Sequence, residues 1–116
     1  MFKKYATHIS FLTLLLLVSC ATKPQSDVDT PEYHFKAGMR AIDNEDYQQS
    51  ITSFQRSVDL DSKFALGYGG LGLANAYLKN NKDAKDFASK CASRGSKDPD
   101  ALSLSARVWI TMRDSE

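Results

Sequence analysis

The chain is poor in the residues that bind metals or form disulfides. Its 116 residues include two cysteines, Cys20 and Cys91, and two histidines, His8 and His34. These four residues are scattered and show none of the short ligand spacings that are typical of zinc sites. Two cysteines are also too few for a disulfide scaffold. We therefore predict no metal centre and no cofactor, and we expect Cys91 to be a small residue buried on a helix face.

The sequence also lacks an excess of charge of one sign. Fifteen Lys and Arg residues oppose fourteen Asp and Glu residues, which gives a formal net charge of +1. Without a basic excess, attraction to nucleic acid or to anionic lipid headgroups is weak, so no nucleic-acid partner is expected. The acidic residues at 43–46 and 59–61 fall at predicted turns and helix ends, not in pairs suited to acid–base catalysis. The chain is not expected to be an enzyme.

No apolar run is long enough to span a bilayer, which takes about 20 residues. The most apolar segment is Ile9–Val18, and it follows the basic residues Lys3 and Lys4. A basic start and a short apolar core are typical of an export signal that is removed from the mature protein. Removal of the whole export signal, which includes Lys3 and Lys4, would take away two positive charges and no negative ones.

The end of this segment, Leu17-Val18-Ser19-Cys20, resembles the lipobox of bacterial lipoproteins. That resemblance implies cleavage after Ser19, so that residues 1–19 are a signal peptide. It also implies a diacylglycerol on the Cys20 thiol and a fatty acid such as palmitate on its amino group. Two or more acyl chains hold a protein on a membrane. The alternative is an ordinary signal peptide in which the cysteine occurs by chance.

Residues 20–30 read as a lipidated cysteine followed by a flexible tether. The segment after Cys20 is polar and contains Pro24, and fully stretched it would span about 30 Å at roughly 3.3 Å per residue. In a cell with two membranes, Ala21 after Cys20 resembles the signal for transport to the outer membrane. We therefore expect a lipid-anchored protein of the bacterial cell envelope, on the periplasmic face of the outer membrane where one exists.

From Thr30 the sequence has the pattern of helices. Thr30-Pro31-Glu32 is a start signal, because it supplies a capping hydroxyl, a proline at the first position and an acid in the first turn. Apolar residues at helical spacing and polar breaks then predict five helices, with no alternating run that suggests a strand. They cover Pro31 to about Asp43, the stripe from Tyr47 to Val58, about Ala65 to Lys79, the stripe from Ala84 to Ala92, and about Pro99 to Met112.

Small residues recur at a spacing of 34. Gly38 and Gly72 are one such pair, and Ser57 and Cys91 are another. Helices joined by short turns form antiparallel hairpins, and small residues let their backbones approach. A helix–turn–helix unit of 34 residues resembles the tetratricopeptide repeat. The predicted fold class is therefore all-α, a short solenoid of two such repeats plus one further helix over residues 31–116.

Several motif positions carry this resemblance, although others depart from the family pattern. The first repeat has Ala37-Gly38, Asp46-Tyr47, Ser50, Phe54 and Ser57, and the second has Tyr68, Leu71-Gly72, Ala84, Ala88 and Cys91. Ser62 and Ser96 replace the proline that commonly closes a repeat. At three positions where the family pattern has an aromatic residue, the second repeat instead has Asn75, Asn81 and Ala88. These losses weaken the packing expected for the second repeat and leave the fold class unchanged.

The resemblance implies a concave groove lined by the first helix of each repeat. Carried over by position, the residues expected to bind a partner are Phe35, Met39, Ile42, Leu73, Tyr77 and Arg107. The pattern of the first helix supports this, because Phe35, Met39 and Ile42 form a second apolar stripe that needs a partner. A peptide or helix of another protein is the expected ligand, with Arg107 recognising an acidic group.

The last predicted helix is apolar around more than half of its circumference. We expect part of it to form an edge for self-association or for another protein, made of Leu104, Val108, Trp109 and Met112. Terminal helices of repeat arrays normally have a polar outer face. Two and a half repeats are also few for a stable array.

A glycine-rich motif at residues 67–72 matches the G-x-G-x-x-G spacing of dinucleotide-binding loops. That fingerprint requires a strand before it, a helix after it and a second strand ending in an acid. Residues 56–61 instead belong to a helical stripe, and no buried strand precedes Asp86. The repeat explains these glycines without a nucleotide.

Taken together, these features predict a lipid-anchored scaffold that holds envelope proteins together. Pilus, secretion and outer-membrane assembly machinery use small lipoproteins of this kind, but fold-level analogy does not choose among them. Two alternatives stay open at this point: a fragment of a longer repeat lipoprotein without independent function, and a non-catalytic subunit of an envelope enzyme.

Overall fold

The computed structural model describes residues 28–116, and this part of the chain is all helical, as predicted. Its helices are α2 (Pro31–Asp43), α3 (Tyr47–Leu60), α4 (Ala65–Tyr77), α5 (Asn81–Arg94) and α6 (Pro99–Asp114). The predicted signal peptide, the lipidated Cys20 and the tether up to residue 27 lie outside the described residues. Within them, the predicted order of helices is confirmed and their bounds agree to within a few residues.

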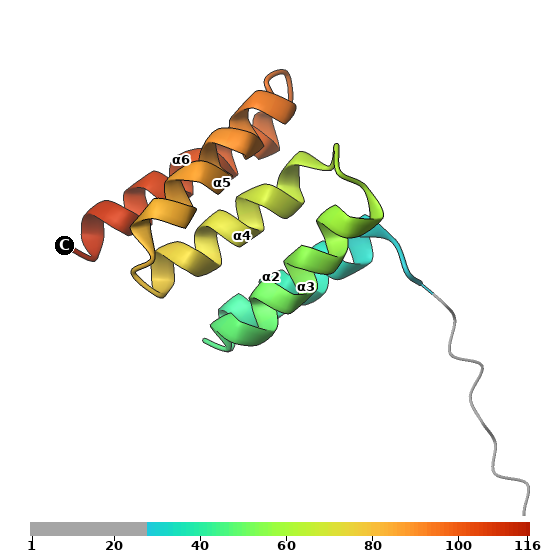
Figure 1. Cartoon of the computed structure of the whole chain (residues 1–116), viewed down its shortest axis with the longest axis horizontal. Coiled ribbons are helices and arrows are strands. Elements are labelled where there is room, and N and C mark those ends of the chain that lie inside the picture. The colour runs from blue at the N-terminus through green and yellow to red at the C-terminus, as the bar shows by residue number, and fades with distance from the viewer. Residues whose placement is uncertain (1–27) are drawn as a thin grey trace, which may run out of the picture.

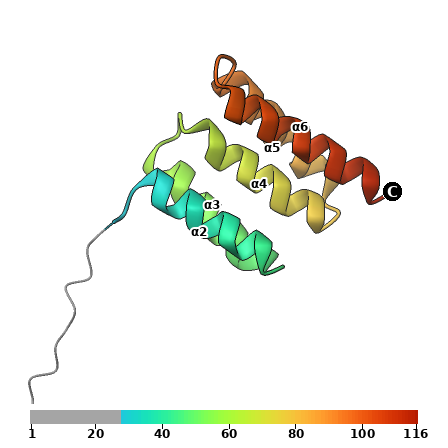
Figure 2. The same ribbon diagram turned by 180° about the vertical axis from the view of Figure 1, so that it is seen from behind.

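Helix α4 is the centre of the arrangement. It contacts α3, α5 and α6, and it also touches α2. In Figure 1, α4 lies between the α2–α3 hairpin and the pair formed by α5 and α6. Figure 2 shows the opposite side, where α2, α4 and α6 lie next to one another on one face. The first helix of each hairpin and α6 therefore share a face of the molecule.

Side chains at the helix starts account for three of the helix bounds. The Thr30 hydroxyl accepts a hydrogen bond from the backbone N–H of Tyr33 at 3.2 Å, as the start signal predicted. Asp46 caps α3 in the same way, and Asp98 caps α6 ahead of a proline at its first position. Each cap satisfies a backbone donor that the first helical turn leaves without a partner.

The turns inside the two hairpins are equivalent at a spacing of 34 residues. Glu45 has φ = 59° and Lys79 has φ = 61°, the only non-glycine residues with positive φ among residues 28–116. In both turns, the N–H of the following residue donates to the carbonyl five residues earlier at 2.9 Å. This is the left-handed helix ending of the Schellman motif. The 34-residue spacing seen in the sequence is therefore repeated in the backbone geometry.

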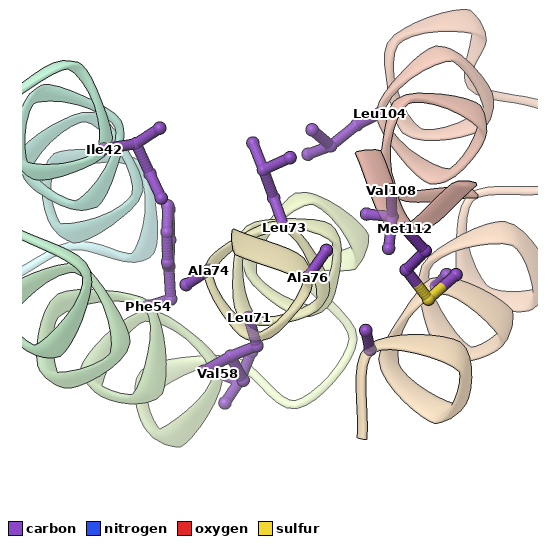
Figure 3. Packing of buried hydrophobic residues seen from close by; sticks show 12 residues of the cluster. Ile42, Phe54, Val58, Leu71, Leu73, Ala74, Ala76, Leu104, Val108 and Met112 are labelled. Carbon is purple, nitrogen blue, oxygen red and sulfur yellow. The ribbon is translucent and has the colours of Figure 1, made fainter. Parts of the chain in front are cut away.

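The core is built around α4, with side chains from both hairpins directed at it. Figure 3 shows α4 end-on, with Phe54 and Val58 of α3 on one side and Val108 and Met112 of α6 on the other. Phe54 is fully buried. Its ring occupies the space that a Cβ would fill at Gly38 of α2 and at Gly70 of α4. Glycine at these two positions lets three helices close around one aromatic ring.

The glycine-rich motif at residues 67–72 lies inside α4 and is a packing motif. All of its glycines are buried, and each faces a neighbouring helix. Gly67 faces Val58 of α3, Gly69 faces Leu104 of α6, and Gly72 lies against the backbone of α5. A phosphate-binding loop needs free backbone N–H groups at a helix start, and these residues lie within a continuous helix.

Several buried polar side chains donate hydrogen bonds to backbone carbonyls. The hydroxyls of Ser57 and Ser105 donate across helices to the carbonyls of Pro31 and Ala88, at 2.8 and 2.9 Å. The Asn75 amide donates to the Leu71 carbonyl at 2.8 Å within α4. These bonds avoid the cost of a buried polar group without a partner and fix how neighbouring helices sit against each other.

Candidate functional site

An open hollow lies where α2, α4 and α6 meet. These three helices lie next to one another in Figure 2. Its volume is about 250 Å³, and it is lined by Phe35, Leu66, Asp100, Ser103, Leu104 and Arg107. Phe35 and Leu66 give it an apolar wall. Asp100 and Arg107 place one acidic and one basic group on the α6 side. Such a surface suits an amphipathic segment better than a small polar substrate.

The apolar wall is held in place by an aromatic cluster. The Phe35 ring lies 5.8 Å from the Phe54 ring and 6.0 Å from the Phe64 ring, measured between centroids. Tilted and edge-on contacts at these distances are favourable for aromatic pairs. Because Phe54 is fully buried, the partly exposed Phe35 ring is positioned by the core, so the wall exists before any ligand arrives.

The basic group of the hollow has no partner within the described part of the chain. Three ion pairs occur there, and none involves Arg107. Arg107 lies on the exposed surface of α6, seven residues from Asp100 and therefore on the same face of the helix. A guanidinium in this position is available to bind a carboxylate, for which its planar fork of N–H donors is suited.

A second hollow lies at the other end of the same strip between α4 and α6. It has a volume of about 290 Å³ and is lined by Ala76, Tyr77, Thr111, Asp114 and Ser115. Tyr77 stacks on Tyr47 of α3 with ring centroids 5.0 Å apart, and that contact fixes the wall. Leu66 and Tyr77 are about three helical turns apart on α4, so the two hollows lie along one line. We call the line of both hollows the α4–α6 groove.

The structure brings together only part of the predicted groove set. Phe35, Tyr77 and Arg107 line the α4–α6 groove as expected. Met39 is partly buried against the core. Ile42 and Leu73 are 5% and 0% exposed, so the prediction that they bind a partner is wrong. Both are enclosed by the packing of α2 and α6 around α4, which leaves them no open surface.

Leu66 and Asp100 were missed by sequence reasoning, although a signal for them was present. These two residues are 34 apart, so they hold equivalent positions at the starts of α4 and α6. Applying the spacing of 34 to the first turn of each helix would have placed both in the groove. The prediction carried over positions only from the middle and end of the helices.

The predicted edge of α6 needs a correction. Leu104, Val108 and Met112 are 8%, 0% and 3% exposed, because this face of α6 packs against α4 and α5. They form part of the core and cannot make an exposed edge. Trp109 is exposed at 46%, as expected. The other exposed large apolar residues of α6 are Leu102 and Ile110.

Asp29 fastens the segment before α2 to the helical body. Its carboxylate forms an ion pair with Arg56 of α3 and lies 2.7 Å from Nε2 of His34. The hydrogen bond from Arg56, followed by that from His34, lowers the pKa of Asp29 below its usual value of 3.8. The His34 side chain is 22% exposed.

We expect the Asp29 contact to stabilise the protein at neutral pH and to be lost in acid. A carboxyl group whose pKa is lowered by folding adds stability above its unfolded pKa, and this is lost as the pH falls through its folded pKa. Asp29→Asn should therefore lower the urea midpoint slightly at pH 7, with the difference from the parent shrinking below about pH 4. Asp43→Asn, at an exposed carboxylate, is the control. An equal loss at pH 7 and pH 3 would mean that the carboxylate charge is not the cause.

Cys91 is a structural residue, as predicted. It is fully buried and free, and its Sγ lies 3.3 Å from the Ala101 carbonyl oxygen. Burial raises the pKa of the Cys91 thiol to about 11, so the reactive thiolate is scarce at neutral pH. Its small size also lets α5 approach α4 at Gly69.

Residues 28–116 contain no group of three or more His, Cys, Asp or Glu side chains that could hold a metal ion. None of the helices in the same range has the length and apolar character needed to cross a membrane. Comparisons with protein-family models, with curated proteins and with solved structures found no match to this chain.

Proposed function

We propose that this chain is a lipid-anchored adaptor of the bacterial cell envelope with a tetratricopeptide-like helical domain. Support for the fold family comes from the 34-residue spacing, which recurs in the small residues and in the left-handed turns at Glu45 and Lys79. The two hairpins and α6 stack through α4, which is how a repeat array buries faces that one hairpin leaves open.

The α4–α6 groove is the observation that carries the binding role. It has apolar side chains held by the core at one end, an aromatic residue at the other, and an arginine free to pair between them. An extended or helical protein segment would place an apolar side chain against Phe35 and Leu66 and an acidic group against Arg107. Burying the anchor side chain supplies affinity, and the charge pair fixes the orientation.

The anchor is proposed from the lipobox-like sequence at Cys20. A protein confined to a membrane surface meets membrane-bound partners at a raised effective concentration, so a groove of modest affinity is sufficient. The adaptor would therefore combine tethering at one end of the chain with recognition at the other.

Site-specific photocrosslinking in cells tests the groove. A photoreactive residue at Ser103, which lines the hollow, should give one dominant adduct with another envelope protein. The same residue at Lys85, exposed on α5, is the matched control and should give little. Arg107→Glu should remove the Ser103 adduct because it repels the acidic group. Equal adducts at both positions, or an adduct that survives Arg107→Glu, would contradict the proposal.

A further inference from the structure

An apolar stripe on α6 is left uncovered by the described chain. It consists of Leu102, Ala106 and Trp109, which share one face of the helix at spacings of four and three residues. All three are exposed, Leu102 at 43% and Trp109 at 46%. Asp98 lies at one end of this stripe and Arg113 at the other. We call the three apolar residues, together with Asp98 and Arg113, the α6 stripe.

The residues of α4 that are equivalent to the α6 stripe are covered by a helix. Subtracting 34 from Leu102, Ala106 and Trp109 leads to Tyr68, Gly72 and Asn75 of α4. That face of α4 is covered by α5: a Cβ at Gly72 would meet backbone atoms of Ala84 and Ala88 at 3.3 Å. Arg94 of α5 lies 4.5 Å from the Tyr68 ring. On α2, Gly38 is likewise covered by α3. The expected occupant of the α6 stripe is therefore another helix.

The order of residues along the stripe makes it complementary to itself. In an antiparallel pair of α6 helices centred on Ala106, Leu102 lies about 6 Å before the centre and Trp109 about 4.5 Å after it, at 1.5 Å per residue. Asp98 lies about 12 Å before the centre and Arg113 about 10.5 Å after it. In the antiparallel pair, Leu102 of each helix therefore faces Trp109 of the other, and Asp98 of each faces Arg113 of the other. The small Ala106 lies at the middle.

We propose that a second copy of this chain packs on the α6 stripe, with the two α6 helices antiparallel about a two-fold axis at Ala106. The Trp109 ring of each copy covers Leu102 of the other, and Ala106 lets the helix axes approach. Arg113 and Asp98 of different copies face each other at the rim. Arg113 now pairs with its own neighbour Asp114 at 3.2 Å, with both side chains largely exposed, a contact that is easily exchanged.

This pairing leaves the α4–α6 groove open. Ser103 and Arg107 lie on a different face of α6 from Leu102, Ala106 and Trp109, since each residue turns the helix by about 100°. A dimer would therefore carry two grooves related by the two-fold axis. Two membrane anchors and two grooves in one particle would convert weak single contacts into bivalent binding.

Disulfide trapping in the full chain tests the two-fold axis. Ala106→Cys should give a disulfide-linked homodimer on mild oxidation of membranes, because only a residue on the axis meets its own copy within the Cα distance of about 4.4–6.8 Å that a disulfide requires. Ser103→Cys, on the groove face, is the matched control and should stay monomeric. The parent chain sets the background from Cys20 and the buried Cys91. Ala106 is exposed, so the new cysteine replaces no core contact.

Two further variants, each made in the Ala106→Cys chain, separate the contacts. Trp109→Glu should abolish the disulfide-linked dimer, because it places a charge against Leu102 of the other copy. Lys85→Glu, at an exposed residue of α5 outside both the α6 stripe and the α4–α6 groove, should leave the yield unchanged. A product in which the introduced cysteine is joined to a different protein, or the absence of any product, would overturn the proposal. An equal loss in the Trp109 and Lys85 variants would also overturn it.

Discussion

Phe54→Ala is expected to lower the free energy of unfolding by about 3–5 kcal/mol, the cost typical of removing a large aromatic side chain from a packed core. The Phe54 ring is fully buried and contacts α2 and α4 at once. Its removal would leave a cavity beside Gly38 and Gly70, which have no side chains to fill it. Urea unfolding of residues 20–116, followed by far-ultraviolet circular dichroism, measures the loss.

Adding a side chain at Gly70 tests whether the loss comes from the contact between Gly70 and the Phe54 ring. A Cβ at Gly70 would clash with the edge of the Phe54 ring, so Gly70→Ala should cost about 1–3 kcal/mol through overpacking. In the Phe54→Ala background the clash is gone, and alanine should gain about 1 kcal/mol of helix propensity over glycine. The two changes are therefore expected to be strongly non-additive.

Gly72→Ala is the control for this pair. The nearest atoms to a Cβ at Gly72 lie at 3.3 Å, and none belongs to Phe54. Its cost should be smaller than that of Gly70→Ala and should be the same with or without Phe54. If the costs of Gly70→Ala and Phe54→Ala simply add, the close contact between the two sites does not control the packing of α4.

Cys20→Ser is expected to abolish lipid attachment and to block cleavage of the signal, so that only the uncleaved apolar segment can hold the chain at a membrane. If Cys20 carries the acyl chains, the variant loses both the thioether lipid and the amide-linked fatty acid, and no other part of the described chain offers a membrane span. Incorporation of labelled palmitate should fall to background, and the chain should keep its uncleaved apolar segment. Palmitate labelling and the mass of the protein report both effects.

Cys91→Ser is the matched control for the anchor. It removes the other cysteine of the chain, which is buried and contacts Ala101. Membrane association and lipid labelling should be unchanged, because any loss of stability in the core leaves the anchor intact. Normal cleavage of the signal in Cys20→Ser would favour an ordinary signal peptide and exclude the lipid anchor.

The order of the helices could be predicted because the local signals and the core agree. Thr30-Pro31 marks the start of α2 and caps it as expected, and the Tyr47–Val58 stripe places Phe54 in the core. Polar residues between the stripes marked the turns. In each case the free energy that decides the structure comes from residues within a few positions of one another, so the sequence displays it.

The exposed surfaces could be predicted only in part, because they depend on which face of each helix its neighbours cover. Helix α4 is made almost wholly of small and apolar residues, so its sequence has no polar stripe to reveal a solvent face. Leu73 was placed in the groove by its position in the repeat, and no polar stripe on α4 was present to show that this residue is buried. For α6, the apolar circumference gave no means to separate the face of Val108 from that of Trp109.

The contact of Asp29 with Arg56 had no sequence signal. The two residues are 27 positions apart, and both belong to types that normally remain solvated. Asp29 was instead assigned to the flexible tether. Its position follows from where the α2–α3 hairpin brings Arg56, which only the tertiary structure determines.

The glycines of α4 bear on how the domain unfolds. Each glycine inside a helix costs about 1 kcal/mol relative to alanine, and α4 contains four of them. Taken alone, α4 would have little tendency to be helical, so its hydrogen bonds persist only while α3, α5 and α6 enclose it. The central helix therefore transmits any loss of packing on one side to the other. The two hairpins then behave as a single cooperative unit, in contrast to arrays whose repeats can open one at a time.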